Sequence, residues 1–148
     1  MNPANPNDPQ TIEVRVRSIR ILWFAMLLTV GLYYFFGLFN GRPKHLTANP
    51  SLSLTLLGAG VLTTLISFLI KPKLLTKAVE QHNLGMVQQA YIVAFAITEV
   101  AALLGLLDFF TTSDRYYYVL FIIAACGMLL HFPRREHVVN AAFKSSIM

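Results

Sequence analysis

The sequence predicts an all-α integral membrane protein: a bundle of four antiparallel spans with both ends in the cytoplasm. Hydrophobic residues fill 55% of the 148 positions, and the mean hydropathy of +0.57 exceeds what a soluble core of this size needs. The apolar residues gather into four long runs, and the lysines and arginines stand between them. The excess apolar surface and the net charge of +5 therefore indicate membrane lipid, not nucleic acid, as the partner.

The four runs define the membrane domain, residues 21–132. A hydrocarbon layer of about 30 Å takes roughly 20 helical residues. The fourth run is the shortest, and Tyr116, Tyr117 and Tyr118 are expected to place its outer end among the headgroups. The spans predicted in this way are residues 21–39, 52–70, 90–110 and 116–132, and the breaks between them fall at Gly41 and Pro43, Pro50, Pro72, residues 111–114 and Pro133.

The two ends of the chain are expected to lie outside the bilayer. Residues 1–20 are interpreted as two parts. Residues 1–10 are a disordered leader, and the basic segment that follows lies on the inner leaflet. Residues 133–148 form the cytoplasmic tail, in which a surface helix is predicted from Glu136 onward. The first span is longer than the apolar region of a signal peptide and has no convincing cleavage site after it, so we expect it to remain as an anchor.

The basic residues predict the orientation, because lysine and arginine accumulate on the cytoplasmic side of membrane proteins. Three such residues lie on one side of the predicted spans: Arg42, Lys44 and Arg115. Nine lie on the other side: Arg15, Arg17, Arg20, Lys71, Lys73, Lys77, Arg134, Arg135 and Lys144. Both termini and the middle loop are therefore predicted to be cytoplasmic, with the protein in the inner (cytoplasmic) membrane of the cell.

Glu99 is the residue that most needs an explanation, because it lies midway along the third span. An ionised carboxylate at that depth costs about 2.5–3.5 kcal/mol on insertion scales. The spans hold no lysine or arginine to pair with it, so the expected neighbours are hydroxyls: Thr98, Thr63, Thr64 and Ser67. Two hypotheses follow. The group binds a proton or a monovalent cation, or Glu99 stays protonated and only specifies helix packing.

Small residues on the second and third spans predict that these two helices pack most closely. The positions are Gly58 and Gly60 on the second span, and Ala94, Ala96, Ala102 and Gly105 on the third. Such faces also predict association, either with further copies of the chain or within a larger membrane complex.

Residues 96–106, with the sequence Ala-Ile-Thr-Glu-Val-Ala-Ala-Leu-Leu-Gly-Leu, resemble the pattern around the ion-carrying carboxylate of rotary ATP synthase c subunits, the proteolipids. The resemblance extends over the hairpin of residues 52–110, with Gln81, His82 and Asn83 near the place of that family's polar loop. It implies that Glu99 carries a proton or sodium ion and that Thr98 is a co-ligand. The loop lacks the family's Arg and Pro, and two further spans flank the hairpin.

The remaining reactive residue types predict no catalytic chemistry. Cys126 is the single cysteine, and the four histidines lack the close spacing of a metal site, so no metal or cofactor is expected. No nucleophile elbow, phosphate-binding loop or other catalytic motif is present, and no enzymatic activity is predicted. His131 is expected to be solvated at the membrane surface, and Asp108 to have a helix-end or snorkelling role near the outer surface.

Overall fold

The computed structural model describes residues 9–40, 49–112 and 116–143. These residues form five α-helices and no strand: α1 (Pro9–Asn40), α2 (Pro50–Glu80), α3 (Leu84–Thr111), α4 (Tyr117–Leu130) and α5 (Arg135–Phe143). By length and composition α1, α2 and α3 can each cross a membrane, whereas α4 and α5 pass the same test only together, with a bend of 44° between them. The prediction of an all-helical chain with several membrane-length helices is confirmed.

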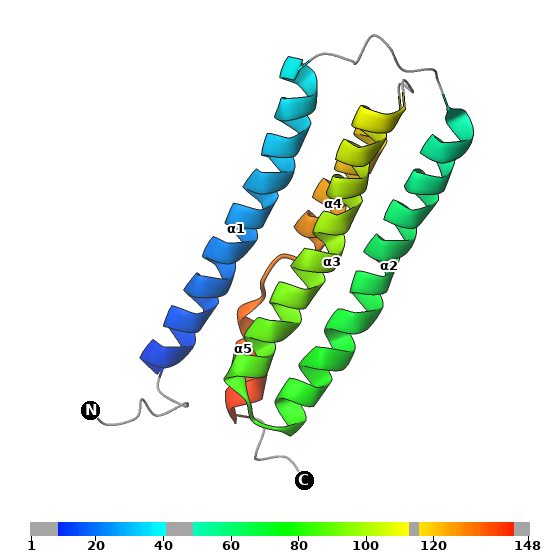
Figure 1. Cartoon of the computed structure of the whole chain (residues 1–148). Coiled ribbons are helices and arrows are strands. Elements are labelled where there is room, and N and C mark those ends of the chain that lie inside the picture. Colours follow the sequence, from blue (N-terminus) through cyan, green and yellow to red (C-terminus); the bar gives the residue numbers. More distant parts are fainter. Residues whose placement is uncertain (1–8, 41–48, 113–115, 144–148) are drawn as a thin grey trace.

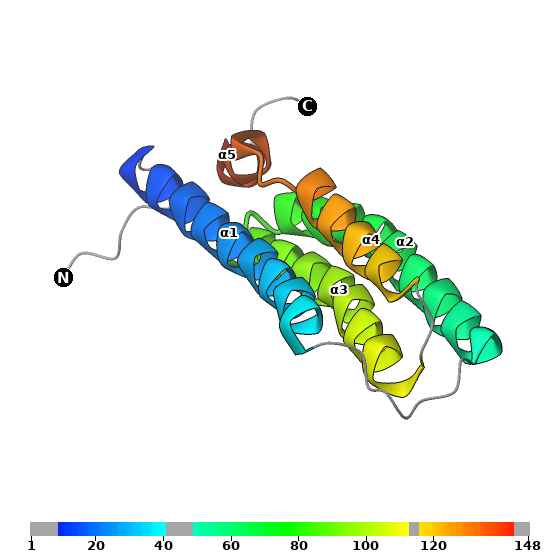
Figure 2. The same cartoon turned by 90° about the horizontal axis from the view of Figure 1, so that it is seen from above.

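Helix α3 is the centre of the bundle and contacts every other helix. In Figure 1 it lies between α1 and α2, which do not touch each other. Helix α4 packs against α1, α2 and α3, and the view from above in Figure 2 shows it beside α2 and α3. The start of α1, the turn between α2 and α3, and α5 lie together at one end of the molecule, which we call the α5 end.

Helices α2 and α3 form a hairpin with the largest interface in the described chain. The turn between them is short because Asn83 caps α3: its side chain accepts hydrogen bonds from Gly85 N at 2.9 Å and Met86 N at 3.3 Å. His82, with φ of 47°, takes the left-handed conformation that ends α2. The small residues thus predict the tightest helix pair correctly.

The helix ends differ from the predicted boundaries at three places. Helix α3 begins at Leu84, six residues before the predicted third span. Pro72 was expected to break the chain, but it lies inside α2, which continues to Glu80. Helix α1 begins at Pro9, so Pro9 and Gln10 are helical and not part of a disordered leader, whose first eight residues lie outside the described chain. Residues 12–20 belong to the same uninterrupted helix as the first predicted span.

The α5 end has an apolar core that explains why the basic segment is not a separate surface helix. Ile12, Val16 and Ile19 recur at helical spacing on one face of α1 and are buried. They belong to one cluster with Val138 and Ala141 of α5. The predicted tail helix is present, and it packs against α1, α2 and α3.

The predicted small-residue positions divide into two groups. Gly60, Ala94, Ala102 and Gly105 are buried, whereas Gly58 and Ala96 are exposed. A side-chain carbon at Gly60 would lie 3.6 Å from the Ala101 Cβ, and one at Gly105 would lie 3.1 Å from the Leu120 Cβ. Nothing lies within 4 Å of the corresponding position at Gly58. Gly60 and Gly105 therefore permit close helix approach within this chain, and Gly58 does not take part in it.

Candidate functional site

Glu99 lies in the middle of α3 and is partly buried. The hydroxyl of Tyr33, on α1, is close enough to its carboxylate to interact with it electrostatically. Exposed apolar residues of α3 run past it along one face: Ile92, Val93, Val100, Leu103 and Leu107. Glu99 therefore sits at the edge of the α3 surface that the other helices leave uncovered.

The hydroxyl residues expected around Glu99 lie on another side of α3. Successive residues of a helix point about 100° apart, and Thr98 faces α2 while Glu99 faces α1. Thr98 Oγ1 lies 3.2 Å from Ser67 Oγ, and it donates to the backbone of its own helix at Ala94 O, 2.8 Å away. The structure thus separates Glu99 from Thr98 and Ser67, in contrast to the sequence-based expectation.

Thr64, Ser67, Thr98 and His131 form a buried group between α2, α3 and the end of α4, which we call the hydroxyl cluster. Ser67 Oγ donates to Thr64 O at 2.6 Å and lies 2.7 Å from His131 Nε2. Thr63 is only partly buried and bonds within its own helix at 3.0 Å. Three of the four predicted hydroxyl residues therefore meet, but they surround a histidine and not a carboxylate.

His131 is 1% exposed, although the sequence suggested a solvated position. Its ring stacks on Phe68 with the ring centres 4.3 Å apart. The aromatic contact and the bond to Ser67 together fix the imidazole inside the bundle. His131 is thus a part of the core that sequence analysis did not identify.

Lys71 places a cation beside the hydroxyl cluster. It is 9% exposed, whereas Lys73 and Lys77 are exposed. Lys71 Nζ donates to His131 O at 3.4 Å and lies 4.4 Å from the centre of the Tyr91 ring. The negative face of an aromatic ring attracts a cation in this position. The three lysines, grouped in the sequence as one cytoplasmic signal, therefore have different environments.

Tyr91 connects this region to α5. Its hydroxyl accepts a hydrogen bond from Arg134 N at 3.1 Å and lies 2.6 Å from His137 Nδ1. Because a phenol has one proton, the hydroxyl can give that proton to a neutral His137. Burial of His137, together with the positive charges of Lys71 and Arg134, lowers its pKa and so favours the neutral ring.

Side chains from two other helices cover the end of α4. Trp23 Nε1 of α1 donates to Met128 O at 2.7 Å, and Lys71 of α2 reaches His131 O. The last carbonyls of a helix have no partner inside that helix, so these bonds compensate for the early end of α4. Phe132 packs edge-on against Trp23, with ring centres 5.1 Å apart.

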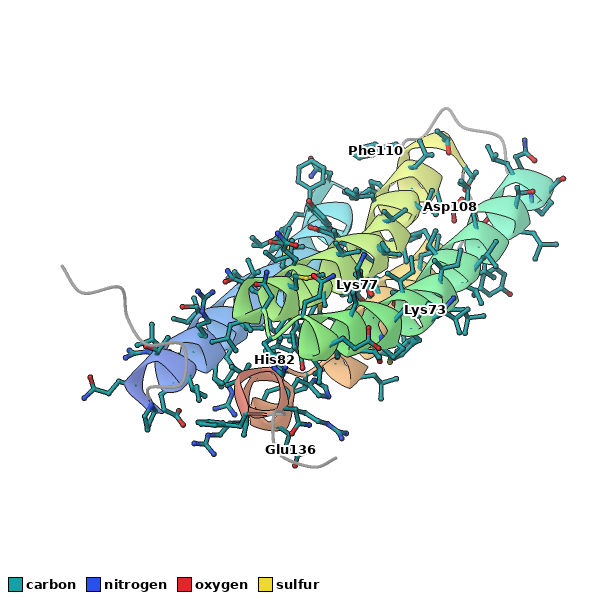
Figure 3. The ribbon with its side chains drawn as sticks, turned by 90° about the horizontal axis from the view of Figure 1, so that it is seen from below. Lys73, Lys77, His82, Asp108, Phe110 and Glu136 are labelled. Atoms are coloured by element: carbon teal, nitrogen blue, oxygen red, sulfur yellow. The ribbon has the colours of Figure 1, made fainter. Side chains whose placement is uncertain are left out.

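A second buried polar group surrounds Asp108 at the end opposite α5. Asp108 is 1% exposed, and Figure 3 shows it between α2 and α3. Its Oδ2 accepts from Ser53 Oγ at 2.9 Å, and its Oδ1 lies 2.7 Å from Thr112 Oγ1. The carboxylate was expected to reach the outer surface by snorkelling. It instead points into the hairpin, where Ser53 of α2 donates to it.

The buried polar residues that sequence analysis did not identify do have a recognisable spacing. Lys71 follows Ser67 by four residues on α2, and Thr98 follows Tyr91 by seven on α3, so each pair lies on one helix face. Ser53 and Asp108 occupy matching positions near the opposite end of the same hairpin. The sequence shows that α2 and α3 each have a polar face. It does not show which residue of one face lies opposite which residue of the other.

Comparisons of the chain with known protein families, curated proteins and solved structures gave no match. Within the described ranges, no three His, Cys, Asp or Glu side chains come together as metal ligands would. The function therefore has to be argued from Glu99 and the two buried polar groups.

Proposed function

We propose that the chain is a four-span protein of the inner (cytoplasmic) membrane, with antiparallel spans and both termini in the cytoplasm. Helices α1, α2 and α3 supply three candidate spans, and α4, which passes the length test only together with α5, supplies the fourth, with α5 as the cytoplasmic tail helix. The α5 end carries basic residues from three parts of the chain, among them Arg15, Lys73 and Arg134. Basic residues accumulate on the cytoplasmic side, so this end faces the cytoplasm.

We further propose that Glu99 binds a proton or a monovalent cation where the protein meets another subunit or a further copy of itself. The observation that supports this proposal is the position of Glu99: it is partly exposed at mid-span, outside the hydroxyl cluster, with the Tyr33 hydroxyl beside it. A hydroxyl does not neutralise a carboxylate. An ionised carboxylate at mid-bilayer costs about 2.5–3.5 kcal/mol, and a bound proton, a cation or a polar neighbour removes that cost.

The chemistry expected of Glu99 agrees with the resemblance of residues 96–106 to the carboxylate region of ATP synthase c subunits. In both cases an acid stands near the middle of an apolar helix with alanines around it. The proposal differs for the co-ligand, because Thr98 points toward Ser67. Tyr33 takes the position beside the carboxylate instead.

A hydrophobic carbodiimide tests the proposal, because it reacts with protonated carboxyl groups in apolar surroundings. In the full chain in lipid nanodiscs we expect a label at Glu99, located by mass spectrometry. Raising the pH or adding sodium ions should reduce the labelling, since each removes or replaces the proton. Glu99→Gln should abolish labelling at position 99, and the matched variant Asp108→Asn should retain it. An unlabelled wild-type protein, or labelling at Glu99 that ignores both pH and cations, would argue against ion binding.

The second candidate is a structural or accessory membrane subunit in which Glu99 only specifies packing. The contact with Tyr33 favours it, because a polar contact between two helices fixes their rotation and depth. In that case Tyr33→Phe should lower the stability of the detergent-solubilised protein by about 0.5–1.5 kcal/mol. Glu99→Gln should leave it largely intact, because the glutamine amide keeps an oxygen that can accept from the tyrosine. The carbodiimide label would then be insensitive to cations. Thermal unfolding and labelling of the same two variants separate the candidates.

A further inference from the structure

A cavity of about 580 Å³ lies along the first part of α1, apart from Glu99 and from both buried polar groups. Its lining includes two arginines, Arg17 and Arg20, and two large apolar side chains, Ile21 and Phe24. All four residues are exposed, so a ligand can reach them. The volume is within the range of about 300–1,000 Å³ that is usual for pockets that hold small molecules.

The two arginines of this cavity have no carboxylate partner in the described part of the chain. Glu13 precedes Arg17 by four residues, the spacing at which two side chains of a helix can form an ion pair. Glu13 Oε1 instead accepts from Arg135 Nε at 2.7 Å, and this is the one ion pair that the described ranges contain. Because Arg135 neutralises Glu13, the charge left at the cavity is that of Arg17 and Arg20. The complementary ligand is therefore an anion.

Contacts with the end of α4 hold Arg20 in place. Its guanidinium carbon lies 5.7 Å from the centre of the Phe132 ring, which packs edge-on against Trp23. An aromatic ring that attracts the cation limits its motion before any ligand arrives, and this lowers the entropy lost on binding. A guanidinium group presents paired N–H donors that match two oxygens of a phosphate. Arg20 thus has the chemistry and the fixed position of a phosphate ligand.

The apolar part of the cavity lies on the side of the arginines that leads toward the middle of α1. Ile21 follows Arg17 by four residues, and Phe24 follows Arg20 by four, so each arginine has an apolar neighbour on its own helix face. Ile21 and Phe24 are 60% and 61% exposed. The order from charged to apolar side chains along the helix matches that of a phospholipid, whose phosphate lies at the surface and whose acyl chains lie deeper.

We propose that this cavity binds a phospholipid with a negatively charged headgroup. Arg17 and Arg20 hold the phosphate, and an acyl chain lies along Ile21 and Phe24. The site rests on the proposed membrane arrangement, in which this end of α1 meets the inner leaflet, but not on ion binding at Glu99. Basic residues at a membrane surface attract anionic lipid in general. A binding site differs from that attraction because it depends on the arginines of the cavity and not on other cations of the same end.

Trp23 is a built-in reporter for this lipid, because it is the single tryptophan of the chain and contacts Phe132 beside Arg20. The full chain is reconstituted in phosphatidylcholine vesicles, and a lipid with brominated acyl chains is added, since bromine quenches tryptophan fluorescence on contact. Brominated phosphatidylglycerol, which carries one negative charge, should quench Trp23 more than brominated phosphatidylcholine at the same mole fraction. From the two quenching curves we expect an affinity about tenfold higher for phosphatidylglycerol.

Two matched double variants separate a site from general attraction. Arg17→Gln with Arg20→Gln should make the two brominated lipids quench equally. Lys73→Gln with Lys77→Gln removes the same charge from exposed positions of α2, labelled in Figure 3, that do not line the cavity. This second variant should keep most of the preference. An equal loss of preference in the two variants would mean that anionic lipid only gathers at a basic surface, and would overturn the site.

Phe132→Leu keeps every charge and removes the ring beside Arg20, so it should reduce the preference several-fold. It keeps the test decisive if the double arginine variant does not fold, and an unchanged preference would overturn the arrangement of Arg20. Excess inorganic phosphate at constant ionic strength should leave the preference intact, because it has no acyl chain. Its loss would assign the arginines to a soluble phosphate compound. Quenching by neither lipid would contradict the membrane arrangement itself, and with it the site.

Discussion

Gly127 controls how closely α4 approaches the hydroxyl cluster. A side-chain carbon at this position would lie 2.8 Å from Thr98 Cγ2 and 2.9 Å from Thr64 Cγ2. Both neighbours are short, β-branched side chains, and their hydroxyls are already bonded to helix carbonyls. Neither can rotate away without breaking a hydrogen bond, so the position has no room for even one methyl group.

Gly127→Ala should therefore destabilise the protein by about 1–3 kcal/mol, the usual cost of overpacking a core. The measurement is thermal unfolding in detergent, with Gly58→Ala as the matched control because no atom lies within 4 Å of its added carbon. The control should unfold at or above the wild-type temperature. Equal unfolding temperatures for the two variants would contradict this packing.

Single residues differ in how well the sequence predicts their surroundings. Glu99 is visible because a lone charge interrupts an apolar run. Its neighbours are not visible, because they depend on the rotation of α3: Thr98, one position away, faces a different helix. Asp108 and Lys71 lie near the ends of their runs, where a charged residue usually reaches water. Only the opposing helix decides that both are buried instead.

At the scale of elements, the pairing of α1 with α5 was the least predictable feature. Ile12, Val16 and Ile19 give residues 12–20 an apolar face that suits a lipid surface or a protein partner equally well. Val138 and Ala141 of α5 provide the protein partner. The sequence shows that the apolar face of residues 12–20 exists. It does not show that this face packs on α5, because the two segments lie more than 100 residues apart and have no pattern that links them. By contrast, the close pairing of α2 with α3 was predictable from their small residues, although the turn between Glu80 and Leu84 is much shorter than the expected connection, residues 71–89.

Val138→Asp should release the first part of α1, because it places a charge in the core of the α5 end, where Val138 is 1% exposed. Hydrogen–deuterium exchange followed by mass spectrometry should show faster exchange of amides in residues 12–20 and unchanged exchange in the middle of α3. Asn140→Asp adds the same charge on the exposed side of α5 and should change neither region. Protection of residues 12–20 in the Val138 variant would mean that α5 does not hold α1.

At the scale of the whole molecule, the distribution of charge predicts the orientation in the membrane. A protein with Cys126→Ala, which removes the only cysteine, allows single cysteines to be placed at Asn140 and Ser51, both exposed. In intact cells a membrane-impermeant maleimide should label Ser51→Cys at once, and Asn140→Cys only after permeabilisation. Labelling of both sites from the same side would exclude four spans with cytoplasmic ends.

The short α4 gives the protein two unequal sides. Its 14 residues cover about 21 Å along the axis, less than a hydrocarbon thickness of about 30 Å, whereas the predicted first span, residues 21–39 of α1, covers about 28 Å. In the four-span arrangement proposed above, the lipid tails beside α4 would therefore compress, and those beside α1 would not. In that arrangement the bilayer would be thinnest along α4, and the mismatch would favour thin bilayers and neighbours that share the deformation.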